Sequence, residues 1–146
     1  ECADPAKERK EEMMQKKLKW LRSTSKKFGN CGKIIHVDGK PVGYAQYAPP
    51  QFLPASKDYR SGPPNKDAVL ISCLFIPHRE FRRLGLGGRL LQSIIDDLRK
   101  RGIKAVETFA RKGKPDNPSG PMDFYLRNGF NTCKDDPEFP LMRLDL

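Results

Sequence analysis

Apolar residues recur at helical spacing in two segments of the chain. Met14, Leu18 and Leu21 follow one another at i, i+4 and i+7 within residues 5–28. A second stripe runs through residues 86–102, which close on basic residues and a glycine, as helices often do. The apolar positions of this stripe are Leu90, Leu91, Ile94, Ile95 and Leu98. The pattern predicts one helix over each segment.

Strand patterns occupy most of the remaining chain. The turn signal Asp38-Gly39 between residues 33–38 and 41–48 predicts a hairpin. Residues 68–76 form a continuous apolar run that stops at Pro77, which is typical of a central strand buried on both faces. Further predicted elements are strands over residues 103–110, 130–133 and 141–146 and a short helix over residues 122–128. Strands that alternate with helices predict an α/β fold, arranged as an α+β sandwich.

Residues 49–66 interrupt this alternation, because prolines and glycines break regular structure there. We expect a long loop in this segment. Loops of that length in a compact domain are either functional or simple connectors, and the sequence leaves both interpretations open.

The length of 146 residues suits a single domain over residues 1–146, and the 37% of hydrophobic residues suits a modest core. No apolar run is long enough to cross a membrane, and the charged N-terminus lacks the apolar centre of a signal peptide. The cysteines are scattered, without a CxxC pair or a histidine cluster, so we expect no metal site. We expect reduced thiols in a cytoplasmic protein. The cysteines are Cys2, Cys31, Cys73 and Cys133.

Positive charge is concentrated in one part of the chain. The formal net charge is +10, and residues 79–114 hold eleven Lys and Arg against four Asp and Glu. A basic surface raises the local concentration of anionic ligands. The segment is therefore a solvated helix face, a site for a polyphosphate ligand, or a nucleic-acid surface.

The sequence Arg-Arg-Leu-Gly-Leu-Gly-Gly-Arg over residues 82–89 lies between the buried strand and the amphipathic helix. Helix N-termini present unpaired N–H groups, and glycines let an anion approach the backbone, so this loop suits a pyrophosphate. The Gly-Lys-Ser/Thr ending of a Walker loop is absent, and the third glycine of a dinucleotide-binding turn is replaced by Leu90. What remains is the pattern R-x-x-G-x-G from Arg82 to Gly87.

This pattern resembles the hallmark of the GNAT acetyltransferases, [Q/R]-x-x-G-x-[G/A] between a strand and the next helix. A second hallmark, a tyrosine followed by x-x-x-G-F, matches Tyr125 to Phe130. The two motifs in order are much more specific than either alone, and the resemblance covers about residues 33–146. It implies a mixed, mostly antiparallel sheet with helices on both faces and splayed central strands.

The resemblance also implies a site for acetyl-CoA or another acyl-CoA. Backbone groups from Gly85 to Arg89 would bind the pyrophosphate, and strand residues would pair with the pantetheine arm. Tyr125 would lie near the CoA sulfur and donate a proton or a hydrogen bond to the departing thiolate. The cofactor-binding positions are Leu74, Phe75, Ile76, Arg82, Arg83, Leu84, Gly85, Leu86, Gly87, Gly88, Arg89 and Asn117.

Acyl transfer to an amine also calls for a proton acceptor. Glu107 is our candidate general base, because burial on an inner strand makes a carboxylate more basic. His36, His78 and Glu80 are alternatives, and many proteins of this fold use a chain of water molecules instead. Cys73 has the chemistry of a nucleophile, but on an apolar strand a small core residue is the more frequent role.

The chain departs from the family pattern at its N-terminus. We expect an N-terminal helix over residues 1–30 and an acetyl-CoA-binding core over residues 33–146, without the usual first strand and first helix. The chain is then either a fragment or rearranged in this half, and that region helps to build the acceptor site in the family. The connection from Pro77 to Arg82 is slightly long, and Asn117 is displaced by one position from the family's asparagine.

The sequence supports an acetyl-CoA-dependent N-acetyltransferase that acts on a primary amine of a small molecule or peptide. The alternative is a basic binding module without catalysis, for RNA or as an acyl-CoA sensor. Nucleic acid is disfavoured, because no row of exposed aromatics and no RNP or KH motif is present. We expect Tyr47, Phe52 and Tyr59 to line the acceptor side. A homodimer is compatible with the sequence, which does not determine the oligomeric state.

Overall fold

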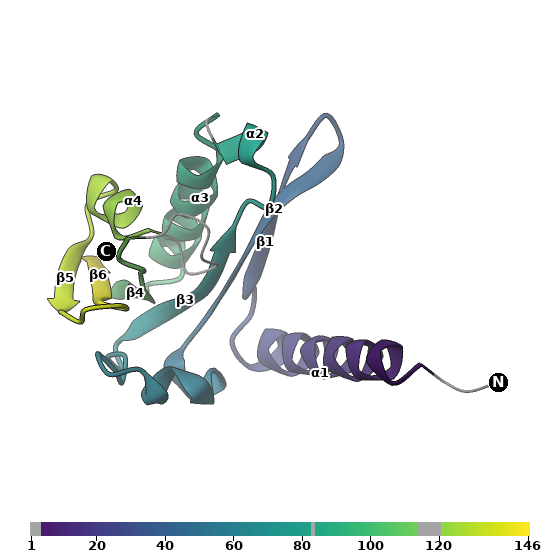
Figure 1. Ribbon diagram of the computed structural model, residues 1–146. Helices are drawn as coiled ribbons and strands as arrows, with labels where there is room; N and C mark the ends of the chain where they lie inside the picture. Colours follow the sequence, from purple (N-terminus) through teal and green to yellow (C-terminus); the bar gives the residue numbers. More distant parts are fainter. Residues whose placement is uncertain (1–3, 83, 114–120) are drawn as a thin grey trace. The chain divides into compact units, whose positions relative to one another are not determined.

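The computed structural model describes residues 4–82, 84–113 and 121–146 (Figure 1). The chain divides into two compact units, Glu1–Cys31 and Gly32–Leu146, and each is described by itself. That both units belong to one domain stays a prediction. Within the described ranges, every helix is too short or too polar to cross a membrane.

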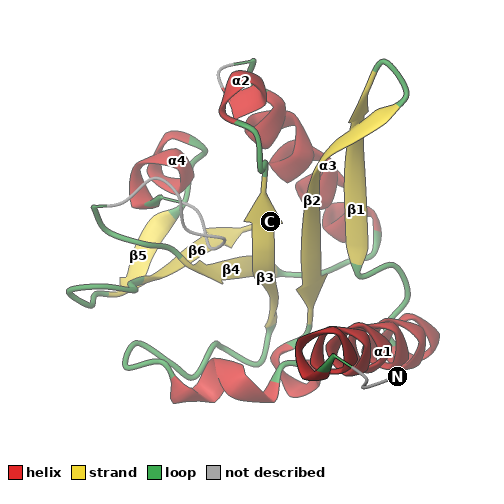
Figure 2. Cartoon of the chain, turned by 45° about the vertical axis from the view of Figure 1, so that its right-hand side comes forward, coloured by secondary structure: helices red, strands yellow, loops and turns green. Residues whose placement is uncertain are grey.

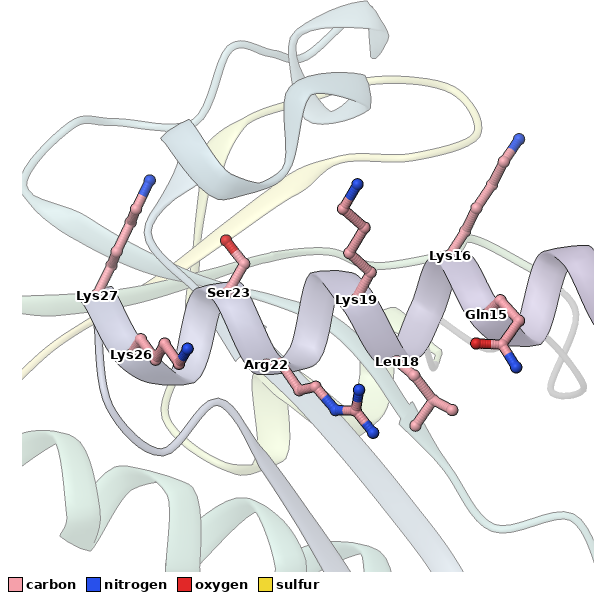
Figure 3. Close-up of a pocket in the computed structure, with 8 residues that line it drawn as sticks. All are labelled: Gln15, Lys16, Leu18, Lys19, Arg22, Ser23, Lys26 and Lys27. Carbon is pink, nitrogen blue, oxygen red and sulfur yellow. The ribbon is translucent and has the colours of Figure 1, made fainter.

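The first unit contains one long helix, α1 (Pro5–Lys27), as the apolar spacing predicted. The Asp4 side chain caps its start by accepting a hydrogen bond of 3.0 Å from the backbone N–H of Ala6. Basic residues outnumber acidic ones on this helix, and the apolar residues Met14, Leu18 and Leu21 are exposed as well. In Figure 3, Lys16, Lys19, Ser23 and Lys27 project to the same side of α1.

The second unit is built on a six-stranded sheet in the order β1-β2-β3-β4-β6-β5 (Figure 2). Neighbouring strands are antiparallel except for the parallel pair β3–β4. The predicted mixed, mostly antiparallel sheet is therefore confirmed. The strands are β1 (Gly32–Val37), β2 (Lys40–Ala48), β3 (Ala68–Phe75), β4 (Ala105–Phe109), β5 (Asn131–Lys134) and β6 (Leu141–Asp145).

The predicted hairpin joins β1 to β2. Asp38 and Gly39 have φ values of 51° and 78°, and both lie in the left-handed region that a two-residue hairpin turn requires. The turn signal in the sequence was thus read correctly, and it fixes the antiparallel register of the first two strands.

One face of the sheet carries α3 (Leu86–Lys100), which packs against β1, β2 and β3. All five residues of its predicted apolar stripe are buried. Tyr47 on β2 lies on the same face, since its hydroxyl donates a hydrogen bond of 2.9 Å to Asp97 on α3. Two shorter helices complete the unit, α2 (Arg79–Arg82) and α4 (Met122–Arg127), and the sequence predicted only the second.

The segment between β2 and β3 packs on the opposite face only around Leu70, near the start of β3. We predicted an irregular loop there, but the segment contains two 3-10 helices, η1 (Pro50–Phe52) and η2 (Pro54–Asp58). Leu53 and Tyr59 from this segment pack against Leu70 in the sheet. The proline that begins each short helix is compatible with it, because its fixed φ suits a first helical position.

The two central strands separate partway along the sheet. Parallel pairing of β3 with β4 ends at Ile71 and Thr108, whereas β3 continues to Phe75. Pairing of β3 with β2 is offset at the same place, because Tyr47 pairs with Ile71 but Gln46 pairs with Cys73. Ser72 is thus an extra residue, and such bulges bend and twist a strand. The splayed central strands that the resemblance implied are confirmed.

Candidate active site

The glycine-rich loop leads directly into α3. Gly85, the residue before the helix, has a φ of 71°, which favours glycine over any residue with a side chain. The first helical hydrogen bond runs from the N–H of Arg89 to the carbonyl of Gly85, so the three preceding N–H groups have no acceptor within the helix. A Cβ added at Gly85 or Gly88 would meet no heavy atom within 4 Å. The loop therefore offers open space beside backbone donors, which suits an anion.

Gly87 brings three elements together. A Cβ at this position would lie 3.5 Å from the Phe124 ring on α4 and 3.8 Å from Ile76, just beyond the end of β3. The helix N-terminus, the end of the central strand and α4 therefore meet at one point. These are the parts of the chain that carry the two sequence motifs.

The last residues of β3, 72–75, lead from this point into the sheet. Leu74 and Ile76 are buried, and Ile76 packs with Val42 and Leu86. Phe75 is half-buried and contacts the Tyr44 ring edge-on, with ring centroids 6.2 Å apart. Within the part of the chain that the structure describes, the ladder between β3 and β4 stops at Ile71, and residues 72–75 extend beyond it.

Tyr125 on α4 is fully buried between Phe124 and Phe130, which contact its ring edge-on. Its hydroxyl has no hydrogen-bond partner among the described residues, although a buried polar group normally has one. Burial raises the pKa of this phenol, the nearby Thr108 hydroxyl offsets part of the rise, and Cys73 adds to it. Thr108 is the residue at which β4 stops pairing with β3, so Tyr125 lies at the apex of the separation.

Residues 1–130 match the sequence profile of a protein family described as "Acetyltransferase (GNAT) family". The chain belongs to the GNAT acetyltransferase family. Comparison with curated proteins gives no match. The family assignment therefore rests on the sequence pattern, and the resemblance seen in the two motifs is confirmed.

Solved structures of GNAT proteins share the fold at low sequence identity. The PaiA N-acetyltransferase from Thermoplasma acidophilum, in complex with coenzyme A, is 16% identical with a TM-score of 0.64, over 90% of this chain and 70% of that one. A ribosomal-protein-alanine N-acetyltransferase from Brucella melitensis is 19% identical with a TM-score of 0.64, over 90% and 78%. N-acetylglutamate synthase from Neisseria gonorrhoeae, complexed with coenzyme A and N-acetyl-glutamate, is 19% identical with a TM-score of 0.56, over 86% and 28%.

The arginines of the GNAT loop differ in their surroundings. The guanidinium of Arg82 donates hydrogen bonds of 2.8 and 3.2 Å to the carbonyls of Ile76 and Pro77, and it lies over the Phe75 ring. Arg82 therefore ties the loop to the end of β3. Arg89 is exposed and lines a hollow on α3 together with Lys33 and Lys100.

Two predicted cofactor-binding residues, Arg83 and Asn117, lie outside the described residues. Leu84, also predicted, is exposed at the start of the loop, whereas Leu86 is buried beneath it. The remaining loop positions lie together at the start of α3, as the GNAT motif requires.

Glu107 is placed differently from what a general base requires. Its carboxylate is fully buried and accepts hydrogen bonds from three donors, which are the backbone N–H and side-chain amide of Asn65 and the guanidinium of Arg143. Arg143 is the direct cross-strand partner of Glu107 on β6 and also pairs with Asp67 and Asp145. The role of Glu107 as base stays a prediction, and these donors count against it, since a base needs a lone pair for the substrate's proton.

The face of the sheet opposite α3 carries other residues than the sequence predicted for the acceptor side. Tyr47 was expected to line the acceptor side, and that prediction was wrong, because its buried side chain points toward α3. Gln46, next to it, faces the other way, and so does its partner Cys73. Sequence reasoning missed this surface, although the alternation along residues 41–48 was a usable signal. Across the described ranges, no three His, Cys, Asp or Glu side chains gather as metal ligands would.

Proposed function

We propose that this GNAT protein transfers an acetyl group from acetyl-CoA to a primary amine by direct attack, with Tyr125 protonating the departing thiolate. One observation carries the proposal: a fully buried tyrosine hydroxyl, without a partner among the described residues, at the apex of the separated strands. A buried hydroxyl without a partner costs free energy, and a bound sulfur at that point would supply the missing partner.

The residues present fit acetyl-CoA from its pyrophosphate to its sulfur. The backbone donors at the start of α3 suit the pyrophosphate, and the open space at Gly85 and Gly88 leaves room for it. Beyond the end of β3–β4 pairing, the backbone of residues 72–75 would offer amide groups to the pantetheine arm in the manner of an added strand. Two structural relatives were solved with coenzyme A, which supports the same ligand here.

The chemistry of the site follows from its polarity. A phenol is protonated at neutral pH at its ordinary pKa, and burial raises the pKa of Tyr125 further, so the hydroxyl can donate a hydrogen bond. A thiolate that forms in the same buried gap is more basic than one in water, because burial disfavours the anion. Tyr125 would hold the departing sulfur by this hydrogen bond and give it a proton as the thioester bond breaks. A backbone N–H of β3 beyond the end of β3–β4 pairing would stabilise the oxyanion that forms on the acyl carbon.

The acceptor amine would approach from the face opposite α3. That face presents Tyr44, Gln46 and Phe75, of which Tyr44 is 41% exposed. One structural relative is a ribosomal-protein-alanine N-acetyltransferase, so a peptide amine belongs in any acceptor panel beside small-molecule amines. The acetyl-CoA-binding core would comprise residues 33–146.

The test combines isothermal titration with acetyl-CoA and a thiol-release assay over a panel of amines. Gly87→Glu places an anion where the pyrophosphate binds, and we expect it to abolish micromolar binding. Ser93→Glu adds the same charge on the exposed side of α3 and serves as the matched control, with binding retained. Binding without turnover of any amine would favour an acyl-CoA sensor. Absence of binding by the intact chain would refute the proposal.

A further inference from the structure

The residue Cys73 occupies an unusual place on β3. It is only half-buried, it is not in a disulfide, and it lies just beyond the end of β3–β4 pairing. The extra residue Ser72 puts Cys73 opposite Gln46, so its side chain lies on the face away from α3. Without that bulge, strand alternation would turn the thiol toward the helix. The interpretation of Cys73 as a core residue therefore does not hold.

Two phenols interact with this thiol. Burial raises the pKa of the Tyr44 phenol, and the neighbouring Cys73 thiol adds to this rise through its Coulombic effect and a side-chain hydrogen bond. Cys73 also contributes to the raised pKa of Tyr125, so the thiol lies near both phenols. A hydroxyl that donates to sulfur favours the thiolate, which is the nucleophilic form of cysteine.

Cys73 and Tyr125 thus border the same gap from opposite faces of the sheet. The Tyr125 hydroxyl is fully buried and unpartnered among the described residues, which points to a ligand atom in the gap. If Tyr125 donates to the leaving sulfur from the α3 face of the sheet, a nucleophile would attack the acyl carbon from the opposite face. Cys73 lies on that opposite face.

We propose that Cys73 is a second acceptor for the acyl group, which becomes S-acetylated when no amine occupies the site. This inference rests on the proposed acetyl-CoA site. The Cys73 sulfur forms a bond to the acetyl carbon, and the bond from that carbon to the CoA sulfur breaks. The thiol proton of Cys73 passes to water as the nucleophile forms, Tyr125 gives its proton to the CoA thiolate, and water returns a proton to Tyr125. One thioester replaces another, so no oxidant or reductant is needed.

The other described cysteines provide internal controls. Cys31 is buried and belongs to the first unit, and Cys133 is exposed on β5. Chemical acylation from solution would favour the exposed thiol of Cys133. Transfer within the site would favour Cys73 despite its lower exposure. The position of the label therefore distinguishes the two routes.

The experiment incubates the full chain with acetyl-CoA without amine and measures the intact mass and the labelled peptide. We expect one acetyl group per chain, on Cys73, removable by neutral hydroxylamine as a thioester is. Cys73→Ser should lose at least nine-tenths of the label, Cys133→Ser should keep it, and Gly87→Glu should abolish it. An amine that the protein acetylates should reduce the label in proportion to its occupancy.

Four results would overturn this inference. Labelling on other cysteines only, or equal labelling of the Gly87→Glu variant, would show acylation from solution. No labelling of a chain that binds acetyl-CoA by titration would refute the thiol acceptor while leaving the proposed function intact. Absence of both labelling and binding would refute both, so the two failures are distinguishable.

Discussion

Replacing Glu107 by Gln tests whether this carboxylate holds the structure or moves a proton. The amide keeps the shape of the side chain but has only one accepting oxygen. The wild-type carboxylate accepts hydrogen bonds from three donors. In the variant, the side-chain NH2 group of Gln would face at least one of these donors and could not accept from it. It also removes the buried negative charge that faces Arg143. We expect destabilisation from both changes.

The magnitude follows from the burial of the pair. Breaking a fully buried ion pair costs about 3–5 kcal/mol, and a hydrogen bond to a charged group contributes about 1.5–3 kcal/mol. Arg143 is 22% exposed and keeps Asp67 and Asp145 as partners, so the loss should be smaller than for an isolated pair. We expect about 2–4 kcal/mol, which lowers the Tm of a domain of this size by roughly 5–15 °C.

Thermal unfolding followed by circular dichroism measures this loss, and acetyl transfer is assayed well below the new Tm. We expect the folded Glu107→Gln variant to retain most of its activity. Asp67→Asn removes the exposed partner of the same arginine and should lower the Tm less. An unchanged Tm together with lost turnover would refute the reasoning and identify Glu107 as the general base.

Further predictions concern the phenol, the glycines and acid stability. Tyr125→Phe should lower kcat about 100-fold or more with acetyl-CoA affinity unchanged, as steady-state kinetics and titration can show, whereas equal kcat would exclude proton donation. Gly85→Ala should destabilise by about 1–2 kcal/mol because its φ is positive. Gly88→Ala, with open space around its Cβ, should not destabilise in the same urea titration. Arg143 holds the pKa of Asp67 below its ordinary value of 3.8, so stability from this pair is present above about pH 4 and lost as pH falls further. Asp67→Asn should flatten that part of the pH profile of urea unfolding.

The sequence predicted those elements whose signals are local. The stripe of α3 has a period that only a helix satisfies, and Asp38-Gly39 specifies its own turn. The end of β3 was marked by Pro77. The glycine-rich loop and Tyr125 were singled out as candidates because motif and element order agreed. These predictions needed no knowledge of which segments meet in space.

The sequence was less informative wherever a prediction depended on a distant partner. Glu107 was read as an available carboxylate because nothing near it in the sequence indicates that Arg143 pairs with it across β4 and β6. The segment 49–66 was read as irregular because Leu53 and Tyr59 pack on the sheet without any periodic spacing. Cys73 was assigned to the core because its facing depends on a register shift against β2.

The register shift between β2 and β3 bears on how the sequence specifies the separation of β3 from β4. Ile71 and Cys73 pair with adjacent residues of β2, so β3 carries one residue more than its neighbour over this stretch. Deleting Ser72 would leave the flanking side chains on the faces they occupy now and would remove only the added bend. The separation of the central strands is thus specified by chain length rather than by the chemistry of any side chain. A single-codon deletion can therefore narrow the gap while every reactive group keeps its identity.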